Sequence, residues 1–179
     1  MLCSNCYATL NDNACPSCGR NLPANARGTI DQATGLMLAG WGRRAGGTFA
    51  DGIVMFLPAL LVYSIFAELD GYTIGSLCTI VAAGAYLVPS WTSKGGQSVG
   101  NRVAITRVRD AATGHRLAGL QAFKRWLFVA LYLAIGLIPG VIPAIVFIAI
   151  VLADVLYPLY DPRNQTLHDK FAGTLVVVA

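Results

Sequence analysis

Residues 43–69 read RRAGGTFADGIVMFLPALLVYSIFAEL, and this stretch decides the fold. From Phe49 to its end only Asp51 and Glu68 are charged, and about 20 such residues cover a bilayer core of roughly 30 Å as a helix. Arg44 and Asp51 are seven residues apart at its start, which is about two helical turns, so they share one helix face. A carboxylate this close to hydrocarbon is costly unless it has a partner or meets water. The stretch therefore predicts a membrane-spanning helix with two charged residues at its entrance.

The composition of the whole chain points to the same class of protein. Of its 179 residues, 55% are hydrophobic and 12% are charged, and the mean hydropathy is +0.59. Soluble domains average about 25% charged residues, so the sequence predicts a multi-pass membrane protein. No nucleophile–base pair and no phosphate-binding loop can be recognised in the sequence, so we expect the protein not to be an enzyme.

The placement of basic residues predicts how many times the chain crosses the membrane. All 13 Lys and Arg residues precede residue 49, lie within 94–125 or follow residue 161. Basic residues gather on the cytoplasmic side, so an even number of crossings must separate these zones. Pro139, Gly140 and Pro143 divide the last long apolar stretch in two. We expect a mainly α-helical, polytopic fold with both termini cytoplasmic, in a bacterial inner membrane. The four predicted transmembrane spans are 49–69, 72–92, 121–138 and 144–160.

The polar segments between and after the spans predict a small cytoplasmic layer. We expect a short helix from Ser98 and a strand over Ile105–Arg109, where β-branched residues gather. Thr174–Val178 is a second β-prone run that could pair with that strand. Thr166 and Asp169 have the spacing of a helix capping box. The basic charge of residues 93–125 could suggest nucleic acid, but a positive-inside loop beside anionic lipid is the favoured interpretation.

The N-terminal segment carries a cysteine pattern typical of a metal site. Cys3, Cys6, Cys15 and Cys18 form two Cys-x-x-Cys pairs with eight residues between them, and four thiolates suit a tetrahedral Zn²⁺ ion. Two disulfides or four free thiols are the alternatives, which the reducing cytosol disfavours. We expect a zinc-ribbon-like domain over 1–22 and a linker over 23–38, with a short helix near Ala33 to Ala39. The membrane domain then covers 39–179.

Three segments of the chain resemble the RDD family of membrane proteins. They are RRAGGTFAD at 43–51, GGQSVGNRVAITRVRDAATGHRL at 95–117 and QTLHDKFAGTLVV at 165–177. The family is named for one Arg and two Asp residues, and Arg44, Asp51 and Asp169 stand at the matching positions. The cysteine segment resembles the zinc-ribbon extension of many membrane proteins. The resemblance implies a multi-pass fold and a loose assignment to transport, with sodium/proton antiport in some members and assembly adaptors among others.

The charged residues of these motifs have structural as well as functional interpretations. Arg44 could anchor the helix at lipid phosphate, or pair with Asp51 or Asp169. Asp51 could complement a helix N-terminus or act as a functional carboxylate, and Asp169 could simply cap its helix. We expect Arg44, Asp51 and Asp169 to form a charge cluster at the cytoplasmic membrane surface, because a guanidinium can hold two carboxylates.

Three further titratable residues carry weaker signals. Asp154 is a secondary candidate for the site, since it is a carboxylate inside the fourth predicted span. It could equally meet water at the inner membrane surface. We expect His115 and His168 to face solvent.

Two functions therefore stay open at this point. In the first, Asp51 and Asp154 bind cations or protons in exchange, with pKa values tuned by burial and by Arg44. In the second, the protein is a non-catalytic membrane adaptor that recruits a soluble partner through its zinc knuckle and basic loop. The lipid bilayer is a partner in either case. A stripe of small residues, Gly71, Gly75, Thr79 and Ala83, offers a close-packing face, and we expect a homo-oligomer.

Overall fold

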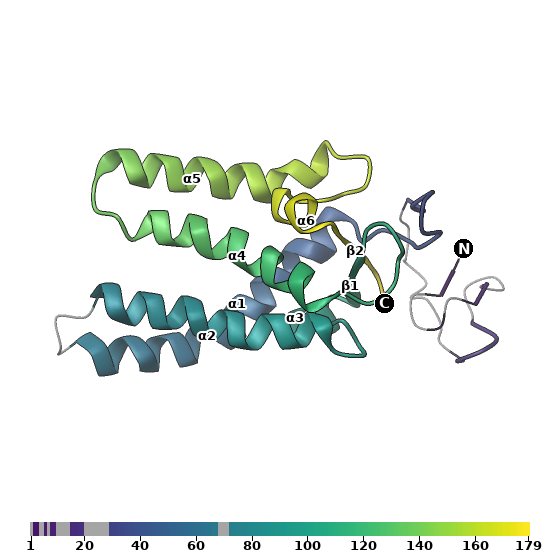
Figure 1. The fold of residues 1–179 in the computed structure, drawn as a ribbon, viewed down its shortest axis with the longest axis horizontal. Helices are drawn as coiled ribbons and strands as arrows, with labels where there is room; N and C mark the ends of the chain where they lie inside the picture. Colours follow the sequence, from purple (N-terminus) through teal and green to yellow (C-terminus); the bar gives the residue numbers. More distant parts are fainter. Residues whose placement is uncertain (1, 4–5, 7, 10–14, 20–28, 68–71) are drawn as a thin grey trace.

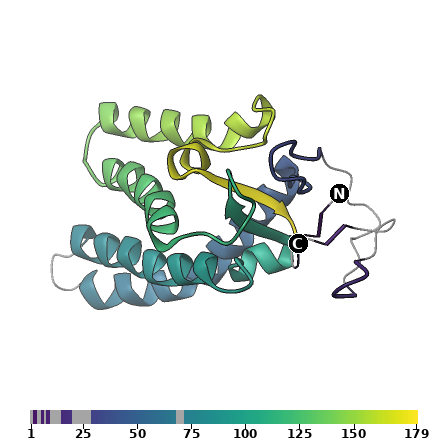
Figure 2. The ribbon, with the colours of Figure 1, turned by 45° about the vertical axis from the view of Figure 1, so that its right-hand side comes forward.

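The computed structural model describes the chain apart from residues 1, 4–5, 7, 10–14, 20–28 and 68–71. Among the described residues the long helices form two hairpins, one of α1 with α2 and one of α4 with α5 (Figure 1). A small sheet and two short helices, α3 and α6, lie at one end of these hairpins, where both termini are also found (Figure 2). The long helices are α1 (Trp41–Ala67), α2 (Tyr72–Thr92), α4 (Gly119–Gly136) and α5 (Val141–Leu156).

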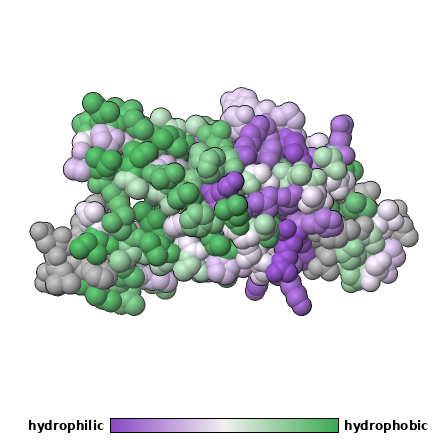
Figure 3. All heavy atoms as spheres, viewed as in Figure 1, coloured by the Kyte–Doolittle hydropathy of each residue, from purple (hydrophilic) through white to green (hydrophobic). Residues whose placement is uncertain are grey.

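Three of these helices are long and apolar enough to cross a membrane. The candidate spans are Trp41–Val62, Thr73–Thr92 and Val141–Leu159. Apolar side chains point outward from them, and Leu57 and Ile142 are 71% and 77% exposed, as expected for surfaces that face lipid. Hydrophobic residues cover the hairpin half of the molecule, while hydrophilic ones gather over the sheet end (Figure 3). The predicted helical membrane fold is thus confirmed in outline, and α4 packs beside α5 at the position of the predicted third span.

Helix α1 begins at Trp41, earlier than the predicted span start at residue 49. The extra two turns are helical because their side chains find partners at the charged end of the bundle. The Trp41 indole N–H donates to the carbonyl oxygen of Val155 at 2.8 Å, and Arg44 pairs with Asp169. Helix α1 therefore carries the motif arginine below the apolar part of the span.

The two strands pair as the sequence predicts, within one residue. Strand β1 (Thr106–Asp110) runs antiparallel to β2 (Thr174–Val178), with Val108 opposite Val176. The short helix α3 (Val99–Val103) is capped by Ser98, whose hydroxyl oxygen accepts from the Asn101 N–H at 3.2 Å, so its predicted start is confirmed. The sheet thereby joins the loop after the first hairpin to the C-terminal tail. The remaining elements are the single turn η1 (Tyr157–Leu159) and α6 (Leu167–Ala172).

The short helix expected near Ala33 to Ala39 is wrong. Residues 32–34 form a turn whose N–H at Thr34 donates to the Asp31 carboxylate at 3.0 Å. Leu38 then forms a bridge with Val177 at the edge of the sheet, and it is only 1% exposed. Burial against the sheet outweighs the weak helical signal of this segment. Of the predicted N-terminal domain and linker, residues 1, 4–5, 7, 10–14 and 20–28 lie outside the described residues.

Glycines permit the two closest approaches between helices. A Cβ on Gly100 would lie 2.0 Å from the carbonyl oxygen of Gly47, so α1 and α3 touch backbone to backbone. A Cβ on Gly84 would lie 2.5 Å from Trp126 Cε2, where α2 meets α4. A side chain at either glycine would overlap its neighbour, which is the α1 backbone at Gly100 and the Trp126 ring at Gly84.

We predict that Gly100→Ala destabilises the protein, because the new methyl group overlaps the backbone of α1. Overpacking of this kind costs typically about 1–3 kcal/mol, and more when backbone cannot move. The measurement is the melting temperature of the purified protein in detergent. Gly46→Ala is the control, since nothing lies within 4 Å of a Cβ at Gly46. An equal melting temperature for both variants would contradict the close approach.

Candidate functional site

The centre of the charged end is a carboxylate held between two guanidinium groups. Asp169 on α6 forms ion pairs with Arg44 on α1 and with Arg125 on α4. The Asp169 side chain is 0% exposed, and each arginine side chain is 8% exposed. We call these three residues the ion cluster. It links the first span, the start of α4 and the C-terminal tail, so three segments far apart in the sequence meet at one carboxylate.

Neutral donors complete the hydrogen bonding of Asp169. The Thr166 N–H donates to its Oδ2 at 3.2 Å and the Thr174 hydroxyl donates to its Oδ1 at 2.8 Å. The Asp169 N–H in turn donates to the Thr166 hydroxyl at 3.1 Å, so the predicted capping box is present. Each carboxylate oxygen thus accepts one charged and one neutral donor. Capping and ion pairing, which the sequence left as alternatives, occur together on Asp169.

Asp51 has a different set of partners. It accepts from the Ser98 hydroxyl at 2.5 Å, the Gly100 N–H at 2.8 Å and the Tyr86 hydroxyl at 3.0 Å. Among the described residues, these hydrogen bonds run to α2 and to the N-cap and first turn of α3. Gly100 lets α3 approach α1 closely, and this places the Ser98 hydroxyl and the Gly100 N–H within hydrogen-bond distance of Asp51. Of the three residues expected to form one charge cluster, Arg44 and Asp169 form an ion pair. Among the described contacts, Asp51 instead binds the start of α3.

Asp154 on α5 and His168 on α6 form a further pair. The Asp154 carboxylate is 3% exposed, and it lies 2.6 Å from His168 Nδ1 and accepts from the His168 backbone N–H at 2.9 Å. The expectation that His168 faces solvent is wrong, since its side chain is 16% exposed. His115, by contrast, lies in an exposed turn. Burial lowers the pKa of His168 to about 4, so the imidazole is neutral at pH 7 and donates Nδ1–H to Asp154.

A cavity of 430 Å³ brings these groups together between the two hairpins. Six of its lining residues are titratable: Arg44, Asp51, Arg125, Tyr132, Asp154 and His168. Apolar side chains of all four long helices complete its wall, including Phe49, Leu87, Val129 and Val155. The cavity is therefore amphipathic, charged at the sheet end and apolar toward the hairpins.

Arg125 is the residue that the sequence interpretation missed. The sequence places it only at the end of the basic zone 94–125, yet it is 6% exposed and belongs to the ion cluster. Its guanidinium lies 4.9 Å from the centroid of the Trp91 ring, a favourable cation–π arrangement. The available signal was an arginine directly before the apolar run from Trp126, together with a carboxylate in the tail that needed counter-charge.

Comparison with known proteins places these residues in a family. The model of the RDD family matches residues 38–173, which is most of the chain and contains Arg44, Asp51 and Asp169. The chain belongs to the RDD family. No curated protein and no solved structure matches it. With its candidate spans, this RDD protein is an integral membrane protein.

The N-terminal segment of the RDD protein holds a second, separate candidate site. The four Sγ atoms of Cys3, Cys6, Cys15 and Cys18 all lie within 4.8 Å of one another. Those of Cys6 and Cys15 are 3.3 Å apart, and those of Cys3 and Cys18 are 3.7 Å apart. Four sulfurs around a tetrahedral zinc at 2.3 Å would be about 3.8 Å apart. The cluster could therefore hold a metal ion, and its donor set and spacing fit Zn²⁺.

We predict that Asp169→Asn destabilises the protein more than Arg44→Met does. The first change leaves two buried guanidinium groups without counter-charge, whereas the second leaves a one-to-one pair of Arg125 and Asp169. Removing one partner of a buried ion pair costs about 3–5 kcal/mol, so Asp169→Asn should approach or exceed this range. Melting temperatures in one detergent measure the order.

Lys170→Met on the same short helix is the control for these variants. Lys170 pairs with Asp161, but its side chain is 42% exposed, and exposed pairs contribute at most about 1 kcal/mol. If Arg44→Met were as damaging as Asp169→Asn, or if Lys170→Met matched both, Asp169 would not be the centre of the cluster.

Proposed function

We propose that this RDD protein is a non-catalytic membrane adaptor, in which the motif charges fasten the helices and the zinc knuckle meets a soluble partner. The observation that carries this proposal is the occupancy of the motif carboxylates. Asp169 accepts four donors and Asp51 accepts three, all from the protein itself. A cation site needs carboxylate oxygens that are open to an ion, and these oxygens already serve neighbouring elements.

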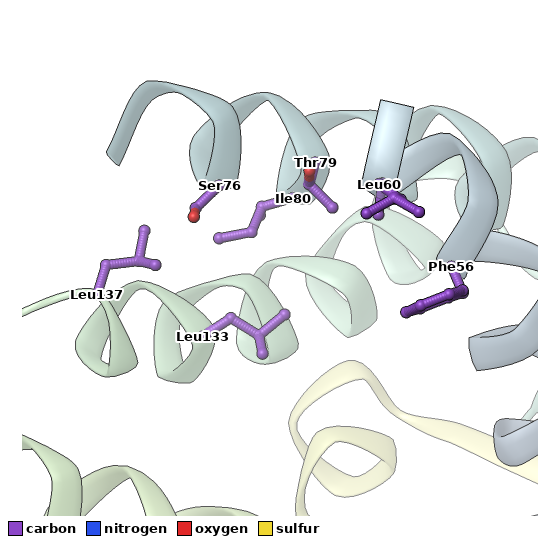
Figure 4. A pocket seen from close by; sticks show the side chains of 8 residues that line it. Phe56, Leu60, Ser76, Thr79, Ile80, Leu133 and Leu137 are labelled. Atoms are coloured by element: carbon purple, nitrogen blue, oxygen red, sulfur yellow. The ribbon is translucent and has the colours of Figure 1, made fainter. Parts of the chain in front are cut away.

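The middle of the helix bundle supports the same proposal. A cavity of 380 Å³ lies between α1, α2 and α4, and its polar lining consists of Ser76 and Thr79. Leu137, directly after α4, points toward Ser76 of α2 there, and Leu133 of α4 lies beside it (Figure 4). The Thr79 hydroxyl donates to the Gly75 carbonyl oxygen at 2.9 Å. An ion crossing here would meet almost entirely apolar groups, which is costly.

The cysteine segment is well placed to meet a partner. Leu2 packs against the buried residues Leu36 and Leu38 and donates its N–H to the Gly35 carbonyl oxygen at 3.0 Å. This contact holds the segment at the sheet end, away from the turn between α4 and α5 (Figure 2). Cys6 and Cys18 are exposed on its surface. We infer one Zn²⁺ per chain, which would order this short segment.

We further propose four membrane spans with both termini cytoplasmic. Helix α4 has 18 residues and packs beside the candidate span α5, so it reaches the same far end of the bundle. Lys and Arg residues at the sheet end would then all face the cytoplasm. A homo-oligomer also stays a prediction. Of the small-residue stripe proposed for it, Thr79 lines the cavity inside the chain, and Gly71 lies outside the described residues.

Cation/proton exchange is the second candidate function, and one observation favours it. Asp51, Asp154 and His168 line the same cavity of 430 Å³. Asp154 is the carboxylate that would exchange a proton for a cation there, because its hydrogen bonds among the described residues come from His168 alone. Separation of the hairpins from α6 would expose it.

The topology makes a direct prediction for cysteine labelling in intact cells. In a cysteine-free background, Val141→Cys at the hairpin turn should react with a membrane-impermeant maleimide added outside, because Val141 is 76% exposed. Thr113→Cys in the exposed turn after β1 should react only after the cells are opened. Reaction of Thr113→Cys in intact cells would rule out a cytoplasmic sheet.

The adaptor proposal predicts a discrete partner at the zinc knuckle. A photo-crosslinking amino acid at the exposed position Ser17 should give one heterologous protein adduct in cells. Cys3→Ser with Cys18→Ser should remove both that adduct and the single zinc measured by elemental analysis. The same crosslinker at Val141 is the control, and it should give lipid adducts instead.

Exchange measurements in everted vesicles separate the two candidates. The adaptor proposal expects the same proton flux from vesicles with wild type, Asp154→Asn or Asp51→Asn, on addition of Na⁺ or K⁺. A wild-type flux that Asp154→Asn abolishes, in protein of unchanged melting temperature, would favour exchange. Crosslinks from Ser17 that persist without zinc would also count against the adaptor.

A further inference from the structure

The ion cluster leaves buried hydrogen-bond donors unused. Arg44 Nη2 binds Asp169, but Arg44 Nε and Nη1 have no partner among the described residues. Arg125 Nε is likewise buried without a partner. A buried donor without an acceptor costs about 1–3 kcal/mol, and more when the group is charged. Three such donors on two neighbouring arginines would be stabilised by a ligand that supplies acceptor oxygens.

These arginines line the charged end of the 430 Å³ cavity. Both side chains are 92% buried, taken from their 8% exposure, so bulk water does not readily satisfy them. The carboxylates around the cavity are already supplied with donors: Asp51 by Ser98 and its neighbours, and Asp154 by His168. What the cavity lacks is therefore an acceptor and not a further cation.

The net charge of the ion cluster is positive, which also favours an anionic ligand. Arg44 and Arg125 carry two positive charges and share the single carboxylate of Asp169. Asp51 and Asp154 also line the cavity, but their oxygens accept hydrogen bonds from Ser98 and His168, and His168 is neutral at pH 7 because its pKa is about 4. Guanidinium N–H groups are strong, charge-assisted donors to phosphate oxygens.

We propose that this cavity binds the phosphate group of a phospholipid, with Arg44 and Arg125 as the ligands of its oxygens. The apolar wall of Phe49, Val129 and Val155 suits the start of the acyl chains, and lipid is the medium around these spans. Free inorganic phosphate offers the same oxygens without that apolar part. The inference is independent of whether the protein is an adaptor or an exchanger.

Arg44→Lys is the most informative variant. Lysine keeps the positive charge that faces Asp169, but it lacks the Nε and Nη1 donors that would bind phosphate oxygens. Arg163→Lys is the matched control, because Arg163 makes a two-pronged pair with Asp31 outside the cavity, at 2.8 and 3.0 Å. Thr48→Leu is a second cavity variant, since it fills the space without removing a charge.

Native mass spectrometry of the full chain measures the binding. The protein is purified in detergent and mixed with phosphatidylglycerol, or with a diacylglycerol of the same chain length that lacks phosphate. Wild type and Arg163→Lys should each retain one phosphatidylglycerol per chain. Arg44→Lys and Thr48→Leu should retain about tenfold less, and the diacylglycerol should be lost from all four.

Melting temperatures of the same samples keep the test valid if a variant folds poorly. Added phosphatidylglycerol should raise the melting temperature of wild type and Arg163→Lys, and leave that of Arg44→Lys unchanged. Displacement of the lipid by 10 mM inorganic phosphate would support the phosphate site but overturn lipid as its source. Equal retention of phosphatidylglycerol by wild type, Arg44→Lys and Thr48→Leu, or equal retention of the diacylglycerol, would overturn the proposal.

Discussion

The structure depends on one carboxylate that is wholly removed from water. Asp169 is 0% exposed, and an isolated charge in such a place would be lost to protonation or would unfold its surroundings. It stays ionised only because Arg44 and Arg125 reach it from α1 and α4. Its burial therefore requires the tail to fold back beneath the first span. The ion pairs of Asp169 and the apolar packing of β2 together fix the position of the tail.

The small sheet follows from that placement of the tail. Gly173 takes a left-handed conformation, with φ of 66°, directly after α6, so the chain turns at once into β2. Strand β2 is buried along its whole length, between β1 on one edge and Leu38 on the other. The Arg125 guanidinium also donates to the Thr174 hydroxyl at 2.8 Å. The ion cluster and the sheet thus share residues and should form together.

Local patterns predicted the elements well, because hydropathy, capping and β-branching act over a few residues. The long helices, the start of α3 at Ser98 and the Thr166–Asp169 capping box all have such local signals. The partners of each charge had none. Asp51 could reach either Arg44 or the first turn of α3, and the choice depends on the contact between Gly47 and Gly100. The same holds for Arg125, His168 and Leu38. Each contacts a segment far away in the sequence, and local hydropathy patterns carry no information about such contacts.

The ion cluster has two arginines for one carboxylate, which is more positive charge than a structural contact requires. A structural tie needs only one arginine for one carboxylate, and a second buried guanidinium adds a desolvation cost that Asp169 can offset only in part. The contact of Arg125 with Trp91 recovers some of it. The unused N–H groups of Arg44 do not contribute to holding the helices together. Buried donors of this kind are usually satisfied, by the protein or by something outside the chain, and both arginines line a cavity that also has an apolar wall. Arg44 and Arg125 thus serve the fold through Asp169, and their remaining donors are the ones that the proposed ligand would satisfy.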